Sequence, residues 1–438
     1  MDRKEYIGLL SGQIRCKRAL PFVTRELEMH IEEQKKDFLA EGMSECEAEE
    51  LAVKEMGDPV EVGIMMDGIH RPKMNWPLIF LIGFISAAGF GAWYYLNNWL
   101  AGGEGRAAEC VLNYTKRYLF YTAAGFLCMV GICYMDYTWF AAKAKRIMLA
   151  YCGVLTAIVC FLTPTPGMED VLDEIVLNAL WIMPFLFVPL YCGVLYSYRG
   201  EGVSGLLKGA AWMMPIAAPL LFYSNRLELL LFLLILAAVL SYAVYSGMFR
   251  IPVKRAIAGI WGATVLLCAG ILSSERFVQG AFSSKEYEEF MLRCRDIVQG
   301  LVEGSRAIGS AGEAMKDSYR FLELSGVFTA GNEFVLTYTA MCFGTFAFAA
   351  VVLVIAALLL KLISMAVKQK NKLGRVTGIG CGLLLLLHGA GYVLANAGVI
   401  MPEQIYCPFS VGGREVMVTY VLMGVVLSIY RYQNISET

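Results

Sequence analysis

Apolar residues along most of the chain fall into long uninterrupted runs rather than into alternating patterns. From residue 73 onward, each run is roughly 18 to 25 residues long, which is the length that a helix needs to cross a bilayer. About ten membrane-spanning helices are predicted on this basis. They lie near residues 76–99, 117–135, 146–163, 175–196, 207–223, 228–247, 255–273, 334–360, 376–396 and 414–431. The predicted fold class is all-α, a polytopic membrane protein.

Residues 1–72 have a different pattern, with charged residues between apolar positions at helical spacing. A helix that starts near Thr24 places Leu27 and Ile31 on one face and stops at Gly42. This part of the chain therefore predicts a small helical domain, separate from the membrane domain of residues 73–438.

Two helix starts can be read directly from residues in this N-terminal segment. Ser44 followed by Glu47 is a capping box for a second helix, which ends at Gly57. Asp58 followed by Pro59 provides a cap and a first-turn proline for a third helix. The stretch "LAEGMSECEAEELAVKEMGDP" resembles the helical prefix domain that precedes many bacterial permease-like membrane proteins.

Lysines and arginines concentrate in alternate loops between the predicted spans. The loops on one side carry Lys143, Lys145, Arg146, Arg199, Lys208, Arg250, Lys254, Arg255, Lys361, Lys368, Lys370, Lys372 and Arg375. The loops on the other side carry few bases. Because basic loops stay in the cytoplasm, both termini and the N-terminal domain are predicted to be cytoplasmic.

Composition supports the prediction of a membrane protein and limits the functions that the chain can have. Of 438 residues, 58% are hydrophobic and 17% are charged, and the net charge of −1 gives no indication of nucleic-acid binding. Most of the 13 cysteines lie inside apolar runs, where they act as small hydrophobic residues. No metal or cofactor motif is present, although a bound divalent cation would be compatible with the sequence.

The loop between the seventh and eighth predicted spans, residues 274–333, is far longer than the others. Its amphipathic stretches and glycines indicate helices and turns rather than disorder. Within it, "VQGLVEGSRAIGSAG" is similar to "GYQxxQSxxAIGSGG" of the SEDS family, the FtsW/RodA/SpoVE proteins of cell division, elongation and sporulation. "LANAGVIMPEQIYCPFSVGG" is similar to the family's "iNiGvv…P.tGi.LPFiSYGG". The resemblance covers roughly residues 76 to 435 and includes ten spans.

This resemblance implies an enzyme that polymerises glycan strands from lipid II, a disaccharide-pentapeptide on a polyprenyl pyrophosphate, at the outer face of the bacterial plasma membrane. It also implies a class B penicillin-binding protein as partner, besides membrane lipids. The matched motifs and the bases beside them imply these substrate-binding residues: Arg276, Ser310, Glu323, Asn396, Ser410, Gly412, Gly413 and Arg414.

A carboxylate at the outer end of the eighth predicted span is the implied catalytic group. The family's "HTDFIFAVIGEELG" corresponds here to "AGNEFVLTYTAMCFG", which places Glu333 at the position of the family's aspartate. Such a group takes a proton from the acceptor sugar hydroxyl. Alternatively, Glu333 is a first-turn carboxylate that stabilises a helix capped by Asn332.

Two other function classes stay open at this point. A SEDS-like protein without catalytic activity would act as a membrane scaffold or regulator in division or sporulation, with the N-terminal domain recruiting a partner. A permease or lipid flippase is the third alternative, although the spans contain few ionisable groups. One of them, His388, is expected to form an interhelical hydrogen bond rather than to relay protons.

Overall fold

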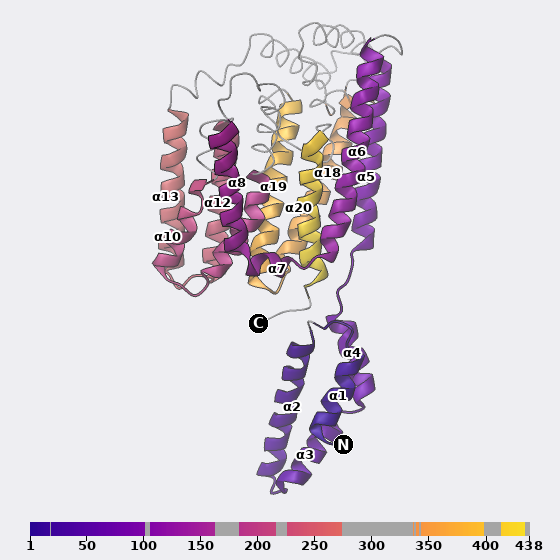
Figure 1. Ribbon diagram of the computed structural model, residues 1–438, viewed down its shortest axis with the longest axis vertical. Coiled ribbons are helices and arrows are strands. Elements are labelled where there is room, and N and C mark those ends of the chain that lie inside the picture. The colour runs from indigo at the N-terminus through magenta and orange to yellow at the C-terminus, as the bar shows by residue number, and fades with distance from the viewer. Residues whose placement is uncertain are drawn as a thin grey trace. The chain divides into compact units, whose positions relative to one another are not determined.

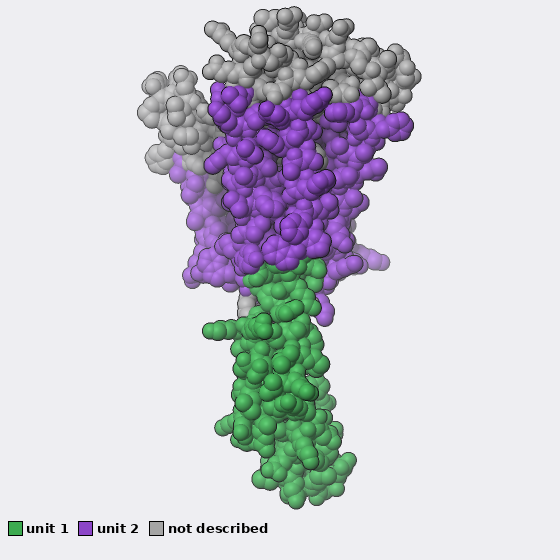
Figure 2. Space-filling model, turned by 90° about the vertical axis from the view of Figure 1, so that its right-hand side faces the viewer, with its two compact units in different colours: residues 1–75, 430–438 green, residues 76–429 purple. Residues whose placement is uncertain are grey.

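The protein is described from a computed structural model. The described residues are 1–17, 19–100, 106–162, 184–215, 226–273, 336, 339–340, 343–397 and 413–433. Within these ranges all regular structure is helical, which confirms the predicted all-α class. The chain forms two compact units (Figure 2): unit 1 comprises residues 1–75 with 430–438, and unit 2 comprises residues 76–429.

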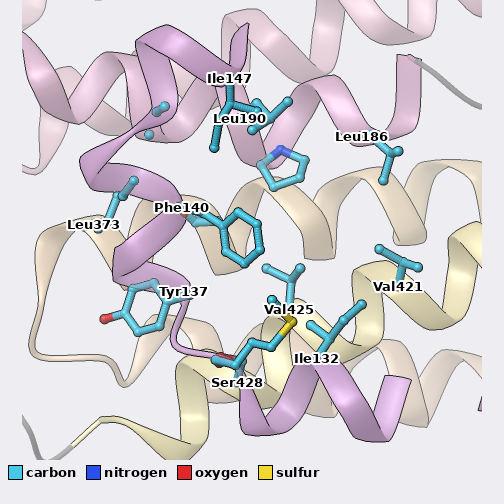
Figure 3. A pocket seen from close by; sticks show the side chains of 16 residues that line it. Ile132, Tyr137, Phe140, Ile147, Leu186, Leu190, Leu373, Val421, Val425 and Ser428 are labelled. Atoms are coloured by element: carbon cyan, nitrogen blue, oxygen red, sulfur yellow. The ribbon is translucent and has the colours of Figure 1, made fainter. Parts of the chain in front are cut away.

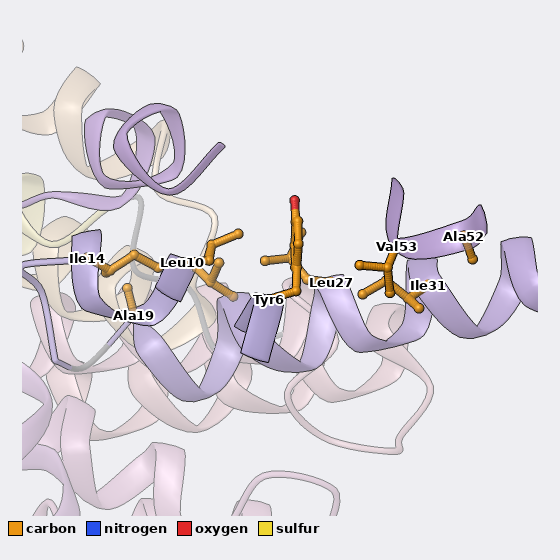
Figure 4. Packing of buried hydrophobic residues seen from close by; sticks show 9 residues of the cluster. Tyr6, Leu10, Ile14, Ala19, Leu27, Ile31, Ala52 and Val53 are labelled. Atoms are coloured by element: carbon orange, nitrogen blue, oxygen red, sulfur yellow. The ribbon is translucent and has the colours of Figure 1, made fainter. Parts of the chain in front are cut away.

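Unit 1 contains four helices (Figure 1): α1 (Arg3–Gln13), α2 (Leu20–Ala40), α3 (Glu45–Glu55) and α4 (Pro59–His70). Apolar side chains from α1, α2, α3 and the α1–α2 connection form one core along α2 (Figure 4). Its members are Tyr6, Leu10, Ile14, Ala19, Val23, Leu27, Ile31, Ala52 and Val53. The expected face of Leu27 and Ile31 is therefore the buried one. Helix α1 was not predicted, and α2 begins four residues before the expected start at Thr24.

Both predicted caps in unit 1 are present. The Ser44 hydroxyl oxygen accepts the Glu47 N–H, and the Glu47 carboxylate accepts the Ser44 N–H at 3.3 Å. The Asp58 carboxylate accepts the Val60 N–H at 3.0 Å, which starts α4. The hydrogen bond to the Ser44 side chain lowers the pKa of Glu47.

An ion pair connects α2 to α3. The Lys35 ammonium lies 2.8 Å from the Glu49 carboxylate and 3.2 Å from that of Glu45. The hydrogen bond to Glu49 raises the pKa of Lys35, and the same bond lowers the pKa of Glu49.

Unit 2 is a bundle of apolar helices. Five of its described helices are long and apolar enough to cross a membrane, and three shorter ones are also apolar. The elements are α5 (Trp76–Leu100), α6 (Arg106–Tyr134), α7 (Tyr137–Ala142), α8 (Ala144–Leu162), a helical stretch Pro184–Ser197, α10 (Val203–Ala211), α12 (Arg226–Tyr245), α13 (Val253–Leu272), α18 (Thr345–Val367), α19 (Lys372–Asn396) and α20 (Gly413–Arg431). The chain is thus a multi-pass membrane protein.

Helix α19 lies at the centre of unit 2 and is buried along most of its length. It approaches α18 closely because Gly378 and Gly382 have no side chain. A Cβ atom at Gly378 would lie 2.6 Å from the Ala366 Cβ, and one at Gly382 would lie 2.6 Å from the Ile363 Cγ1. Small residues four apart allow this close helix packing inside a membrane.

The structure differs from the predicted spans in three places. The eighth span was predicted as one helix from residue 334, but Gly344 has φ of +85° and α18 begins after it, at Thr345. Helix α10 has nine residues, and the rest of the predicted span 207–223 falls largely outside the described residues. The short helix α7, capped by Asp136, was not predicted.

Candidate functional site

The structure describes three of the nine predicted site residues. Asn396 ends α19, Gly413 begins α20, and the backbone of Arg414 lies in the first turn of α20. The other six lie outside the described residues: Arg276, Ser310, Glu323, Glu333, Ser410 and Gly412. The whole of the long loop, residues 274–333, and all of the glycine-containing turn except Gly413 therefore lie outside the described residues.

Asn396 is fully buried and connects two segments that are far apart in the chain. Its Oδ1 accepts a hydrogen bond from the Leu336 backbone N–H at 3.1 Å, across 60 positions of sequence. Its Nδ2 donates to the Tyr392 carbonyl oxygen at 2.9 Å, one turn earlier in α19. Leu336 is three residues after Glu333, so the end of α19 fixes the backbone just beyond the predicted catalytic carboxylate.

A turn at Gly344 separates this segment from α18. The described positions 336, 339, 340 and 343 are helical, and the Gly344 N–H donates to the Ala340 carbonyl at 2.8 Å. Gly344 then adopts the left-handed backbone region, which a residue with a Cβ rarely enters. Gly344 therefore sets the described helical positions before it apart from α18, and one of these positions, Leu336, is bound to Asn396.

The described residues of the segment after Glu333 and of the motif "LANAGVIMPEQIYCPFSVGG" lie at one end of unit 2. Helices α19 and α20 run in opposite directions, so the end of α19 and the start of α20 are on the same side of unit 2, opposite α7 (Figure 1). Asn396 and Leu336 are at this end, which is the end where the sequence predicts the external site. The arrangement brings the sequences around Leu336, Asn396 and Gly413 to one side of the membrane.

His388, two turns before the end of α19, is buried between aromatic rings. Its ring centroid lies 4.8 Å from that of Phe185 and 5.7 Å from that of Phe232. Its Nδ1 is 2.9 Å from the Leu384 carbonyl oxygen of the same helix, and its Nε2 has no hydrogen-bond partner among the described residues. Among the described residues, the prediction of an interhelical hydrogen bond for His388 is therefore wrong. His388 instead contacts other helices by ring packing.

An apolar cavity of about 280 Å³ lies at the opposite end of the bundle (Figure 3). Helix α7 forms one wall, with Tyr137 and Phe140, and α20 contributes Val425 and Ser428. Its lining includes no acidic or basic side chain among the described residues, and its polar side chains are the hydroxyls of Tyr137, Thr377 and Ser428. Leu373, which also lines it, is 23 residues before Asn396 in α19, a distance of about 35 Å at the helical rise of 1.5 Å per residue. The cavity is thus separate from the predicted site.

Basic side chains accompany aromatic rings at this cavity end. Lys143 Nζ lies 4.2 Å from the centre of the Trp139 ring, and Lys145 Nζ lies 3.9 Å from that of Tyr198. Lys208 pairs with Glu201 at 3.0 Å. Such aromatic and basic residues are typical of a membrane–water interface.

In the described part of the predicted site, the Asn396 side chain positions the backbone at Leu336 and carries no acidic or basic group. Around Asn396 the site offers amide hydrogen bonds and buried apolar side chains. No group of three or more potential metal ligands occurs among the described residues. Sequence reasoning named Asn396 but missed its partner Leu336, because only the folded chain brings them together.

The helical arrangement places the chain in a known structural class, the fold of the rod-shape-determining protein RodA, a polytopic SEDS protein. No protein-family model and no curated protein sequence matches the chain.

The particular matches are to solved structures at low sequence identity. RodA of Thermus thermophilus matches with a TM-score of 0.52 and 16% identity, and the match covers 82% of this chain and 97% of RodA. An aspartate-to-alanine mutant of the same RodA matches with the same TM-score and covers 98% of that chain. A chain of a peptidoglycan synthase complex matches with a TM-score of 0.58 and 16% identity, over 82% of this chain and 98% of that one. The uncovered share of this chain is close to the size of residues 1–75.

Proposed function

We propose that this chain is a divergent SEDS-type glycosyltransferase that polymerises lipid II at the outer face of a bacterial plasma membrane. The RodA fold, matched over nearly the whole of that chain, is the main support. Such an enzyme would act in division, cell shape or sporulation. Both termini and unit 1 would then be cytoplasmic, as the basic loops predict.

In this proposal Glu333 acts as the general base. The acceptor hydroxyl attacks the anomeric carbon of the donor sugar, its proton passes to the Glu333 carboxylate, and polyprenyl pyrophosphate leaves with the bonding electrons. General-base catalysis of this kind contributes a rate factor of about 10² to 10⁴. Arg276 and Arg414 would offset the charge of the leaving pyrophosphate.

The remaining predicted residues would shape the substrate cavity. Ser310 and Glu323 would contribute from the long loop, and Ser410, Gly412 and Gly413 from the turn before α20. Glycine at such a turn allows the backbone to approach a ligand closely.

For Asn396 the hydrogen bonds support a positioning role in place of the direct substrate contact suggested by the family resemblance. Two of its hydrogen bonds go to backbone groups, and its side chain is fully buried. By holding the Leu336 N–H, it would set the backbone that carries Glu333. A displacement of about 1 Å at a reacting group can lower the rate by about a hundredfold, so this bond would influence catalysis without touching the substrate.

A class B penicillin-binding protein is the proposed partner. The chain shares its fold with a member of a peptidoglycan synthase complex that couples polymerisation and crosslinking. A partner of that class would bind unit 2 and receive the growing strand.

The test is polymerisation of purified lipid II by the full-length protein, with each candidate penicillin-binding protein of the source cell. Glu333→Gln should reduce strand formation by about 10²-fold or more. Glu201→Gln is the matched control, because Glu201 pairs with Lys208 at the cavity end of unit 2, far from the proposed site. This control should polymerise at the wild-type rate.

Two results would overturn the proposal. One is equal polymerisation by wild type and Glu333→Gln. The other is an absence of polymer with every partner, together with normal growth of cells that carry only the Glu333→Gln variant. The second result would favour the non-catalytic scaffold.

A further inference from the structure

Helix α4 of unit 1 exposes an apolar face to its surroundings. Its outward positions fall within about half of the helix circumference, and Glu61 is the one charged residue among them. The apolar stripe, as this set is called below, consists of Val60, Ile64, Met65 and Ile69, with exposures of 60% for Ile64 and 57% for Met65. The opposite face, with Gly63 and Asp67, packs against α1.

Basic residues gather at the end of α4 that leads to the membrane. The Asp67 carboxylate accepts the Arg15 backbone N–H at 2.9 Å, and the Asp67 carbonyl accepts the Arg71 N–H at 2.8 Å. These bonds bring the α1–α2 connection beside the end of α4. The Arg15 side chain is 85% exposed, and its Nε lies 3.9 Å from the Asp67 carboxylate.

The charge of unit 1 is divided between two parts of its sequence. Residues 14–20 and 68–75 contain five lysines and arginines and no acid. Residues 41–55, which include α3, contain six glutamates and one lysine. The basic cluster, defined as Arg15, Lys17, Arg71 and Lys73, therefore sits on the part of unit 1 that continues into the first membrane helix.

The chain itself limits how far the basic cluster can be from lipid. Residues 71–75 separate α4 from α5, and this stretch spans at most about 20 Å when fully extended. Within unit 1 the Lys73 N–H donates to the carbonyl of Arg431, the last residue of α20, at 3.2 Å. Lys73 is three residues before the start of α5, and Arg71 is two residues before Lys73.

We propose that the apolar stripe and the basic cluster form a docking face for the lipid bilayer, specifically for a leaflet rich in anionic phospholipids. An amphipathic helix with apolar side chains on one face and neighbouring bases binds such an interface. Bases close to a membrane span attract anionic head groups. The six glutamates of residues 41–55 would then face the aqueous phase. This surface is independent of the polymerase chemistry, so either proposal can fail without the other.

Two methionines of unit 1 provide a matched pair for the test. Met65 belongs to the apolar stripe and is 57% exposed, and Met29 on α2 is 56% exposed among acidic neighbours. The full-length protein would be reconstituted in nanodiscs of phosphatidylcholine alone, or of phosphatidylcholine and phosphatidylglycerol in equal amounts. Peroxide oxidation of each methionine would be followed by mass spectrometry.

In the anionic discs Met65 should be oxidised several-fold more slowly than Met29, and the difference should shrink in phosphatidylcholine alone. Removing two bases, by Lys17→Gln with Arg71→Gln, should restore Met65 oxidation in the anionic discs. Lys36→Gln with Lys54→Gln removes two exposed bases elsewhere in unit 1 and should leave the protection unchanged.

Three outcomes would overturn the proposal. Equal oxidation of Met65 and Met29 in both lipids would show that the stripe faces water. Protection of Met65 that also occurs in detergent and increases with protein concentration would show that a second copy covers it. Protection that is independent of lipid, detergent and concentration would show a contact within the chain.

Discussion

The hydrogen bond from the Leu336 N–H to Asn396 can be tested by Asn396→Leu. This change replaces the buried amide with an apolar group and leaves the Leu336 N–H without its acceptor. Leaving a buried donor unsatisfied costs about 1–3 kcal/mol. If that cost falls on the segment around Leu336, its opening equilibrium should increase by a factor of about 5 to 150.

Hydrogen–deuterium exchange of the protein in nanodiscs measures this opening directly. The peptide that contains Leu336 should exchange faster in Asn396→Leu by the factor given above. Asn396→Asp is the matched variant, because it keeps a side-chain oxygen that can accept the Leu336 N–H and loses the amide that donates to the Tyr392 carbonyl. We expect it to retain most of the protection at Leu336. Peptides from α2 should be unaffected in both variants.

Exchange of Leu336 at the wild-type rate in Asn396→Leu, while the protein stays folded, would contradict this prediction. Equal exposure of Leu336 in Asn396→Asp and in Asn396→Leu would also contradict it. The first result would mean that other contacts hold the segment. The second would assign the effect to the bond within α19.

Three further changes test the packing and the electrostatics. Residues 1–75, expressed alone, should lose unfolding free energy by about 2–5 kcal/mol on Leu27→Ala, measured by urea denaturation. Hydrogen bonds hold the pKa values of Glu47 and Glu49 below the ordinary 4.5, so their stabilisation is complete above that pH and is lost as the pH falls through the lowered values. Replacing both by glutamine should flatten the acid decline in urea titrations. In the full chain, Gly378→Ala should cost about 1–3 kcal/mol and lower the melting temperature, whereas Gly259→Ala, with open space around it, should not.

The sequence predicted those features that depend on interactions between residues close together in the chain. The Ser44–Glu47 capping box and the Asp58 cap are both present, because each is formed by side chains within three positions of the N–H groups that they accept. Helix α1 was missed because Gly8 and Gly12 weaken its helical signal and its main packing partner, α4, is distant in the sequence.

Hydropathy could not locate the break at Gly344. Apolar residues continue on both sides of it, so the run resembles one span. Gly344 has a positive φ, and Leu336, eight residues before it, is bound to Asn396. The hydrogen bond that holds this part of the chain spans 60 residues, so no local pattern contains it.

The candidate site was predictable only in part for the same reason. The family resemblance selected Asn396 by its place in a motif, whereas its burial and its hydrogen bond from the Leu336 N–H come from tertiary packing. Residue type alone does not distinguish an asparagine that binds a sugar from one that holds a backbone.

Because α19 runs from one end of unit 2 to the other, its packing at Gly378 affects the position of Asn396 at the far end. Gly378 and Gly382 fix it against α18, and Asn396 fixes the segment that precedes α18. Asn396 is 18 residues beyond Gly378, about 27 Å along the axis, so a tilt of about 3° around the glycine contact would move it by about 1.4 Å. A shift of that size exceeds what a positioned catalytic group tolerates without about a hundredfold loss of rate. If Glu333 is the base, the contact at Gly378 is therefore part of what positions it, although it lies near the other side of the membrane.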